Sequence, residues 1–229
     1  MRAKGVLVLL PESVVIRGDV RIGDGVVVEP YAVITGPCVI EDGVYIGAHA
    51  VIGAAPQHHG SYPSPLGGVV RDAHGVRVGR GATIREFVTI HQGVVSQTSV
   101  GEDALVMAGC HVSHDSRVGD RVTLGSFSVL GGFTMIDQDA TLGQAVVTHP
   151  WILIGEAAMV GLNSSVVKDV LPFAKVAGAP ARILGSNTHR DESLPAAYDE
   201  AVVASDVWDR WGGLVECRAQ LRDAYRSAA

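Results

Sequence analysis

The sequence predicts a parallel β-helix, on the strength of a six-residue repeat, a high glycine content and a shortage of aromatic residues. Of the 229 residues, 28 are glycine, 47% are hydrophobic and only 5% are aromatic. Each glycine inside a helix destabilises a helical bundle by about 1 kcal/mol relative to alanine. A disordered chain combines low hydrophobicity with high net charge. The composition therefore disfavours both classes and favours a narrow interior filled by small aliphatic side chains.

The repeat places an aliphatic residue at every sixth position. It spans residues 10–52, resumes over 78–90 and, after a slip of four residues, continues over 100–166 with Thr148 as the exception in that last run. A period of six matches neither the alternation of an ordinary strand nor the turn of an α-helix. Each hexapeptide is expected to form one short strand and one turn, with the aliphatic residue and the small residue four positions later pointing inward. If three hexapeptides close one coil, residues 18 apart lie above one another.

The turns and the interruptions of the repeat carry separate expectations. Glycine often follows the aliphatic residue, as at Gly23, Gly47 and Gly101, which suggests tight corners with unusual backbone angles. Residues 53–77 form an inserted loop rich in proline, glycine and histidine, and loops of this length are usually functional or disordered. The shorter slip after Val94 is interpreted as a bulged corner.

The C-terminal part of the chain has a different pattern. Apolar residues from Tyr198 to Tyr225 fall near helical spacing, and Gly212-Gly213 interrupts them. We expect two short amphipathic helices that cap the prism or pack on a neighbouring subunit. The domain organisation predicted is a β-helix domain over 1–187 and a helical tail over 188–229.

Charge and cysteine content limit the class of protein. A net charge of −6 gives no electrostatic footprint for nucleic acid. The early apolar run over 5–10 is too short for a membrane span or a signal-peptide core. Three cysteines without metal-type spacing suggest reduced thiols and a cytoplasmic location. No membrane partner is expected.

The most suggestive chemistry lies at His114, Asp115 and Gly132. His114 falls on the outer surface near a predicted corner, and Asp115 can orient its ring. Gly132 is 18 residues further on, so its backbone N–H should lie beside that ring. A base beside an amide donor is the minimal equipment for acyl transfer through an oxyanion. Spacing alone equally allows His114 to be a solvated corner histidine.

Three segments resemble the UDP-N-acetylglucosamine O-acyltransferases, the first enzymes of lipid A synthesis. They are Ile84–Gly93 (IREFVTIHQG), the segment of His111 and His114-Asp115, and Ile52-Gly53 with Pro56-Gln57. The resemblance covers most of residues 10–190. It implies a left-handed parallel β-helix, a homotrimer and an active site between subunits. It also implies that His114 is the general base, that Asp115 is its partner and that Gly132 is the oxyanion glycine.

Substrate-binding residues follow from the same resemblance and from charge. His111 and His149 match further active-site histidines of the family, and Asn187 matches an asparagine that contacts the nucleotide. The inserted loop offers Gln57 and His58 to the acceptor. Arg85 belongs to a group of arginines that could receive the phosphopantetheine phosphate or an acidic carrier protein. His91 also matches a family position but is interpreted as a corner histidine.

Departures from the family concern the substrates. His58-His59-Gly60 stands where the family has an aspartate and a lysine, Pro150 replaces a glutamine and Phe133 replaces a histidine. Residues 176–182 resemble the terminal signature of acetyltransferases that use acetyl-CoA. The expected reaction moves an acyl group from acyl carrier protein or acyl-CoA to a hydroxyl or amino group of a sugar, a nucleotide sugar or a related small acceptor. Neither a permanent cofactor nor a metal is expected.

Two other classes of function remain open. One is a zinc hydratase like the γ-type carbonic anhydrases, although His111 and His114 are closer in sequence than the metal-binding pair of those enzymes. The other is a non-catalytic trimeric scaffold, which would have no reason to keep His114-Asp115 and Gly132 together.

Overall fold

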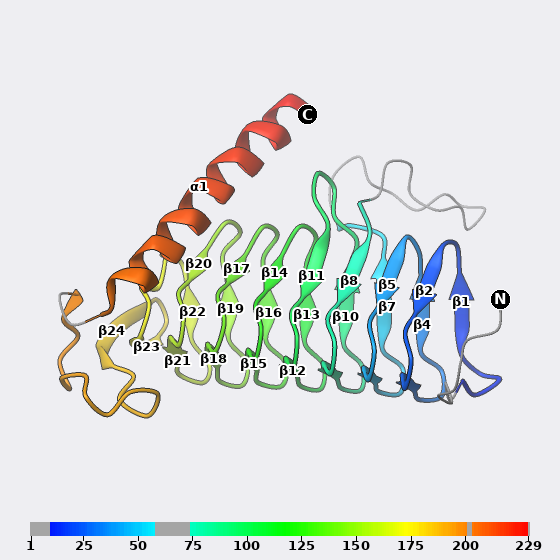
Figure 1. The fold of residues 1–229 in the computed structure, drawn as a ribbon, viewed down its shortest axis with the longest axis horizontal. Helices are drawn as coiled ribbons and strands as arrows, with labels where there is room; N and C mark the ends of the chain where they lie inside the picture. The colour runs from blue at the N-terminus through cyan, green and yellow to red at the C-terminus, as the bar shows by residue number, and fades with distance from the viewer. Residues whose placement is uncertain (1–9, 58–73, 201–202, 229) are drawn as a thin grey trace.

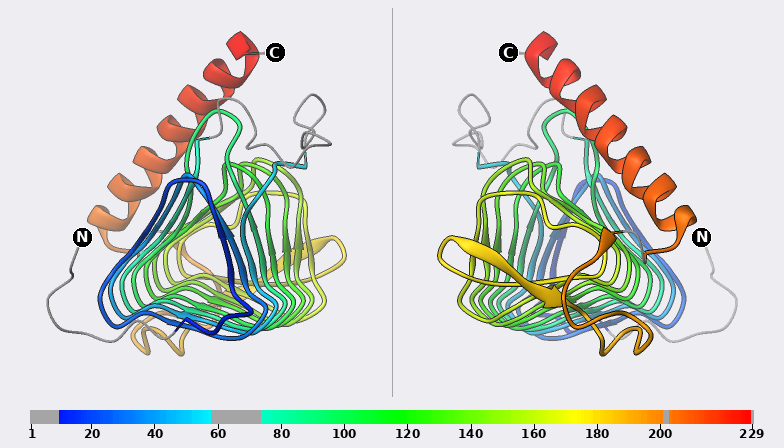
Figure 2. Two further views of the ribbon diagram at one scale, coloured as in Figure 1. Left: turned by 90° about the vertical axis from the view of Figure 1, so that its right-hand side faces the viewer. Right: turned by 90° about the vertical axis from the view of Figure 1, so that its left-hand side faces the viewer.

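The chain forms a long triangular prism with one helix along its side. A computed structural model describes residues 10–57, 74–200 and 203–228. Seen along its axis in Figure 2, the prism has three walls, each a sheet of short strands stacked from one end to the other. The predicted fold class, a parallel β-helix with a C-terminal helical tail, is confirmed.

Except for the last two strands, which both join sheet 3, successive strands belong to successive sheets, so each sheet takes every third strand. Sheet 1 contains β1 (Val15–Arg17), β4 (Val33–Thr35), β7 (Val51–Ala54), β10 (Thr89–His91), β13 (His111–Val112), β16 (Val129–Leu130), β19 (Val147–Thr148) and β22 (Ser165–Val166). Sheet 2 contains β2 (Val20–Ile22), β5 (Cys38–Ile40), β8 (Val76–Val78), β11 (Thr98–Val100), β14 (Arg117–Val118), β17 (Met135–Ile136) and β20 (Leu153–Ile154). Sheet 3 contains β3 (Val27–Val28), β6 (Tyr45–Ile46), β9 (Thr83–Ile84), β12 (Leu105–Val106), β15 (Thr123–Leu124), β18 (Thr141–Leu142), β21 (Met159–Val160), β23 (Ala174–Gly178) and β24 (Ala181–Ser186).

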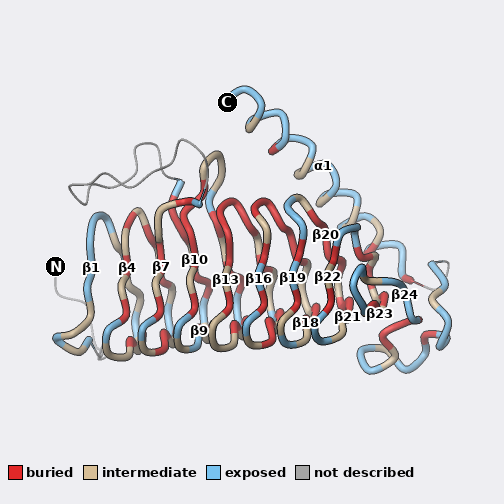
Figure 3. Tube along the Cα trace, turned by 180° about the vertical axis from the view of Figure 1, so that it is seen from behind, coloured by how far each residue is buried: buried red, intermediate tan, exposed pale blue. Residues whose placement is uncertain are grey.

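The pairing confirms the register of 18 residues. Val112 pairs with Leu130, and Val118 pairs with Ile136, both in parallel. The repeat positions from Val28 to Val166 fill the interior almost without exposure, and the small residues between them, such as Ala50 and Cys110, are buried with them. Buried segments recur in each coil from Val26 onward, whereas the first coil at the β1 end is exposed or half-buried (Figure 3). Thr148 is buried too, because its hydroxyl pairs with that of Thr134 and accepts the Gly131 N–H.

The reason for glycine after the aliphatic residue differs from the prediction. These glycines do not have positive φ; the left-handed corner residue lies two positions later, as at Gly25 (φ 68°) and His49 (φ 59°). A Cβ at Gly23 would lie 2.4 Å from the Asp42 carboxylate, and one at Gly101 would lie 2.5 Å from the backbone of the next coil. The glycines therefore allow adjacent coils to approach closely, and the prediction based on backbone angles was wrong.

The C-terminal tail corrects a second prediction. Instead of two short helices, residues Ser205–Ala228 form one helix, α1, that continues through Gly212-Gly213. The helix crosses the outer face of sheet 2 (Figure 1), where Leu221 packs with Met135 and Leu153. Arg210 pairs with Glu156, and Arg218 pairs with Asp169. These tertiary contacts outweigh the low helix propensity of two glycines. Within the described ranges, no helix is long and apolar enough to span a membrane.

Candidate active site

The corner that joins sheet 1 to sheet 2 positions His114 and Asp115, between β13 and β14. His114 lies on the turn with 8% of its surface exposed, and Asp115 is fully buried with φ of 59°. The carboxylate oxygen Oδ2 of Asp115 is 2.8 Å from His114 Nδ1. Because a carboxylate accepts, this contact fixes Nδ1 as the protonated nitrogen and directs Nε2 away from Asp115.

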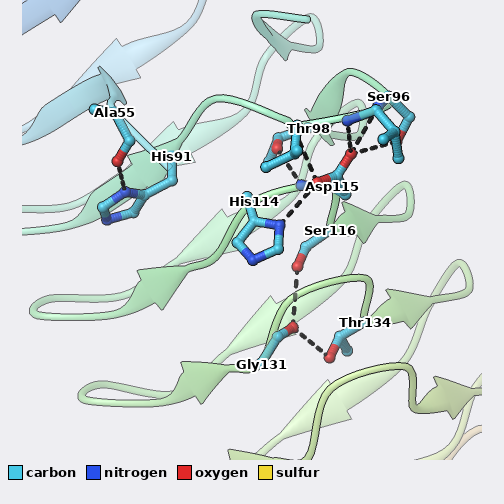
Figure 4. A network of polar contacts seen from close by, with 11 residues as sticks. Ala55, His91, Ser96, Thr98, His114, Asp115, Ser116, Gly131 and Thr134 are labelled. Atoms are coloured by element: carbon cyan, nitrogen blue, oxygen red, sulfur yellow. Dashed lines mark hydrogen bonds and ion pairs between the residues drawn. The ribbon is translucent and has the colours of Figure 1, made fainter. Parts of the chain in front are cut away.

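The four-residue slip in the repeat holds this carboxylate in place. The N–H groups of Val94, Val95 and Ser96 donate to Asp115 at 2.9, 2.9 and 2.7 Å, and the Ser96 hydroxyl donates at 3.1 Å (Figure 4). Burial would raise the pKa of the Asp115 carboxyl, but these donors and His114 outweigh burial and lower it. The insertion is thus a carboxylate clamp rather than a simple bulge, and Asp115 stays ionised beside His114.

Gly132 lies against the other edge of the His114 ring. A Cβ built on Gly132 would be 2.7 Å from both Cε1 and Nε2 of His114, too close for any side chain. One coil before and one coil after, the equivalent position on this corner carries His114 and Pro150, so the corner itself does not demand glycine. The close approach to His114 therefore explains why position 132 is glycine.

Two further histidines lie next to this corner on sheet 1. His111 of β13 contacts Thr89 Oγ1 through Nδ1 at 2.9 Å, and burial lowers the pKa of His111 to about 4. The ring of His91 lies 4.7 Å from that of His111, centroid to centroid. His91 is buried rather than at a corner, and its Nδ1–H donates to the Ala55 carbonyl at 2.6 Å (Figure 4). Burial also lowers the pKa of His91, so both rings are neutral near pH 7.

An aromatic cluster borders the site on the side facing α1. Phe133 meets His114 edge to face at 5.2 Å and stacks on Trp151 at 3.7 Å, centroid to centroid. Tyr225 of α1 packs edge-on against Phe133. Phe133 thus extends an apolar surface from α1 to the corner that carries His114.

The other predicted site residues lie at different places. His149 is exposed on the same corner, one coil beyond Gly131, and Gln57 is exposed at the start of the inserted loop. His58 falls outside the described residues. Arg85 lies on the corner between sheets 3 and 1, where it pairs with Glu86. Asn187 is buried at the corner between sheets 2 and 3 and donates to the Ala157 carbonyl. Within one chain, Arg85 and Asn187 therefore do not join His114.

Sequence reasoning missed two contributors to this arrangement. It interpreted His91 as a corner histidine in preference to the family match. The four-residue insertion after Val94 also hides from the repeat count that Thr89 aligns with His111. Sequence reasoning also missed the clamp by residues 94–96. An alignment of the repeats that placed the inserted residues 94–96 opposite Asp115 in the neighbouring coil would have indicated both the place of His91 and the contacts to Asp115. Within the described residues, no group of three His, Cys, Asp or Glu side chains could hold a metal ion, which gives no support to the zinc alternative.

Comparison with known proteins decides the family. The protein family described as "Bacterial transferase hexapeptide (six repeats)" matches residues 19–54 and 97–132 of this chain. The chain is 31% identical over 206 residues to an acyl-[acyl-carrier-protein]–UDP-N-acetylglucosamine O-acyltransferase of Rhizobium johnstonii, with 85% of this chain and 71% of the relative covered. The chain belongs to this acyltransferase family. It is an enzyme of the hexapeptide-repeat acyltransferase type.

Solved structures of the family agree on the fold. The UDP-N-acetylglucosamine acyltransferase from Campylobacter jejuni is 28% identical with a TM-score of 0.68, over 89% of this chain and 77% of that one. The enzyme from Francisella novicida has a TM-score of 0.71 at 24% identity, over 92% and 85% of the two chains, and speaks for the fold alone.

Proposed function

We propose that the protein transfers an acyl group from the thioester of acyl carrier protein to a hydroxyl group of a sugar nucleotide, with His114 as the general base. The observation that carries the proposal is the position of the His114 ring between the Asp115 carboxylate and Gly132. The donor and the acceptor come from the printed names of relatives such as the one from Rhizobium johnstonii.

In the proposed reaction, Nε2 of His114 takes the proton of the acceptor hydroxyl as its oxygen attacks the thioester carbonyl carbon. The carbonyl oxygen becomes an oxyanion, which accepts a hydrogen bond from the Gly132 N–H. Collapse of the tetrahedral intermediate breaks the C–S bond and forms the ester. The imidazolium of His114 returns its proton to the thiolate, so the base is regenerated. Asp115 stabilises the imidazolium throughout.

His111 and His149 are proposed to position the substrates, together with Gln57 and His58 of the inserted loop. His111 is suited to hydrogen bonding rather than to charge, because its lowered pKa leaves the ring neutral. Arg85 and Asn187 lie on other corners, so roles at this site would require an adjoining subunit. Acyl-CoA stays an alternative donor.

We further propose that the working form is a cytoplasmic homotrimer built on sheet 1. Its outward residues include Val129 and Val147, 39% and 46% exposed, and Phe127 on the adjoining corner is 68% exposed. Apolar surface of this kind marks an interaction site. This apolar surface lies next to His111 on the outer face of sheet 1, since His111 pairs with Val129.

The test is a matrix of donors and acceptors analysed by mass spectrometry. Acyl carrier protein and CoA thioesters of several chain lengths are each incubated with UDP-N-acetylglucosamine and with amino-sugar nucleotides. Acceptor acylated only in the presence of enzyme supports the proposal. Absence of acylated product across the matrix, with intact donors recovered, would support the scaffold alternative instead.

A further inference from the structure

A cavity between α1 and the corner of His114 includes His149, proposed above to position substrate, while its other lining residues have no part in the reaction described so far. It measures about 470 Å³ and is lined by Trp151 and neighbouring residues of the prism and by Arg218 and Arg222 of α1. Pro150 and Lys168, also in its wall, follow His114 and Gly132 at intervals of 18 residues on the same corner. At about 4.8 Å per coil, the cavity begins roughly 10–14 Å along the axis from His114.

The charge of the cavity is strongly unbalanced. Arg218 is neutralised, because its guanidinium donates to both oxygens of Asp169 at 2.8 Å, as well as to the Trp151 carbonyl. Within the described residues, Lys168 and Arg222 line the cavity but show no ion pair. Two cations therefore face one opening, and the acid among the lining residues, Asp169, is already paired with Arg218.

The aromatic wall fixes one of these cations. The guanidinium carbon of Arg222 lies 5.3 Å from the centre of the Trp151 ring. Phe133 also stacks on this ring, at 3.7 Å between centroids. A guanidinium resting on an aromatic face keeps its N–H groups available at its edge, and their fork matches the oxygens of a phosphate.

We propose that this cavity is a binding subsite for a phosphate ester, with Arg222 and Lys168 as its anion-binding residues. In either proposed substrate, a phosphate stands some distance from the reacting atom: beyond the sugar ring in a sugar nucleotide, and at the end of the pantetheine chain in the donor. The separation of the cavity from His114 suits such a group. The choice between these two sources rests on the proposed function, whereas the anion site itself does not.

Equilibrium binding without turnover tests the subsite. Two pairs of probes differ only by phosphate: UDP against uridine, and 4′-phosphopantetheine against pantetheine. For at least one pair, the wild-type protein should bind the phosphorylated member about tenfold or more tightly, since hydrogen bonds to a charged group contribute about 1.5–3 kcal/mol. Arg222→Ala and Lys168→Ala should remove most of that preference.

Arg226→Ala is the matched control, because Arg226 lies one turn further along α1, does not line the cavity and is largely exposed. It should keep the wild-type preference. A preference lost in the UDP pair assigns the site to the acceptor, and one lost in the pantetheine pair assigns it to the donor. Equal binding of all probes by wild type, Arg222→Ala and Lys168→Ala would overturn the subsite. Because no turnover is needed, that result is distinct from failure of the acyltransferase assay.

Discussion

At the scale of single residues, the site depends on contacts too close to permit substitution. The methyl group of Gly132→Ala would lie only 2.7 Å from Cε1 and Nε2 of His114. The ring must move, and displacement of a catalytic group by about 1 Å costs on the order of 10²-fold in rate. Because His114 and Pro150 occupy the equivalent positions on the same corner, the fold should persist. We expect kcat to fall about 10²-fold at an almost unchanged melting temperature; unchanged kcat would show that the ring does not need its present place.

A second residue-scale prediction concerns His111 and pH. Its pKa is about 4 in the folded protein and about 6.5 when exposed, so between these values the unfolded chain binds more protons. Protonation of His111 therefore lowers the free energy of unfolding as pH falls from about 6.5 to about 4. In His111→Gln, the melting temperature should fall less steeply across that window, with the weaker effect of His91 remaining. An identical slope in the two proteins would show that partial burial does not lower the pKa of His111 in the folded protein.

The residues show where prediction from sequence reached its limit. His114, Asp115 and Gly132 follow from a spacing of 18, which the repeat makes a spatial rule. His91 and Ser96 could not be placed in the same way. The slip between them breaks the count, and only the folded backbone shows the inserted amides turned toward Asp115.

At the scale of elements, helix α1 shows how packing overrides local propensity. Gly212 and Gly213 lie within the helix, and a Cβ at either would meet nothing within 4 Å. Alanine should therefore stabilise the protein by about 0.5–1 kcal/mol at each position. In a chain of this size that raises the melting temperature by about 1–4 °C per substitution, measurable by calorimetry. A lower melting temperature for Gly212→Ala would instead indicate a helix break, as the sequence pattern had suggested.

Elements with strict periodicity were predictable, and those without it were not. The strands follow the hexads because each aliphatic position must reach a narrow interior. The sequence pattern did not indicate which wall α1 covers. That choice depends on outward residues of sheet 2, such as Met135 and Leu153, which fall between the inward positions of the repeat.

At the scale of the whole molecule, α1 packs on sheet 2, and the trimer proposed above would use the outer face of sheet 1, where Val129 and Val147 are exposed. Val129→Glu places a charge on that face beside Val147. Burial of an unpaired charge is strongly unfavourable, so the variant should dissociate toward the monomer in light scattering while wild type is trimeric. A variant that stays trimeric would place the interface elsewhere.

We propose that the prism serves acyl transfer by holding His114 between the Asp115 carboxylate and Gly132. The most direct test of that claim is the rate of acyl transfer by His114→Ala, measured with saturating donor and acceptor. Loss of the general base should lower kcat at least about 10²-fold, with unchanged melting temperature and donor binding. Near wild-type kcat in a folded His114→Ala protein would contradict the account.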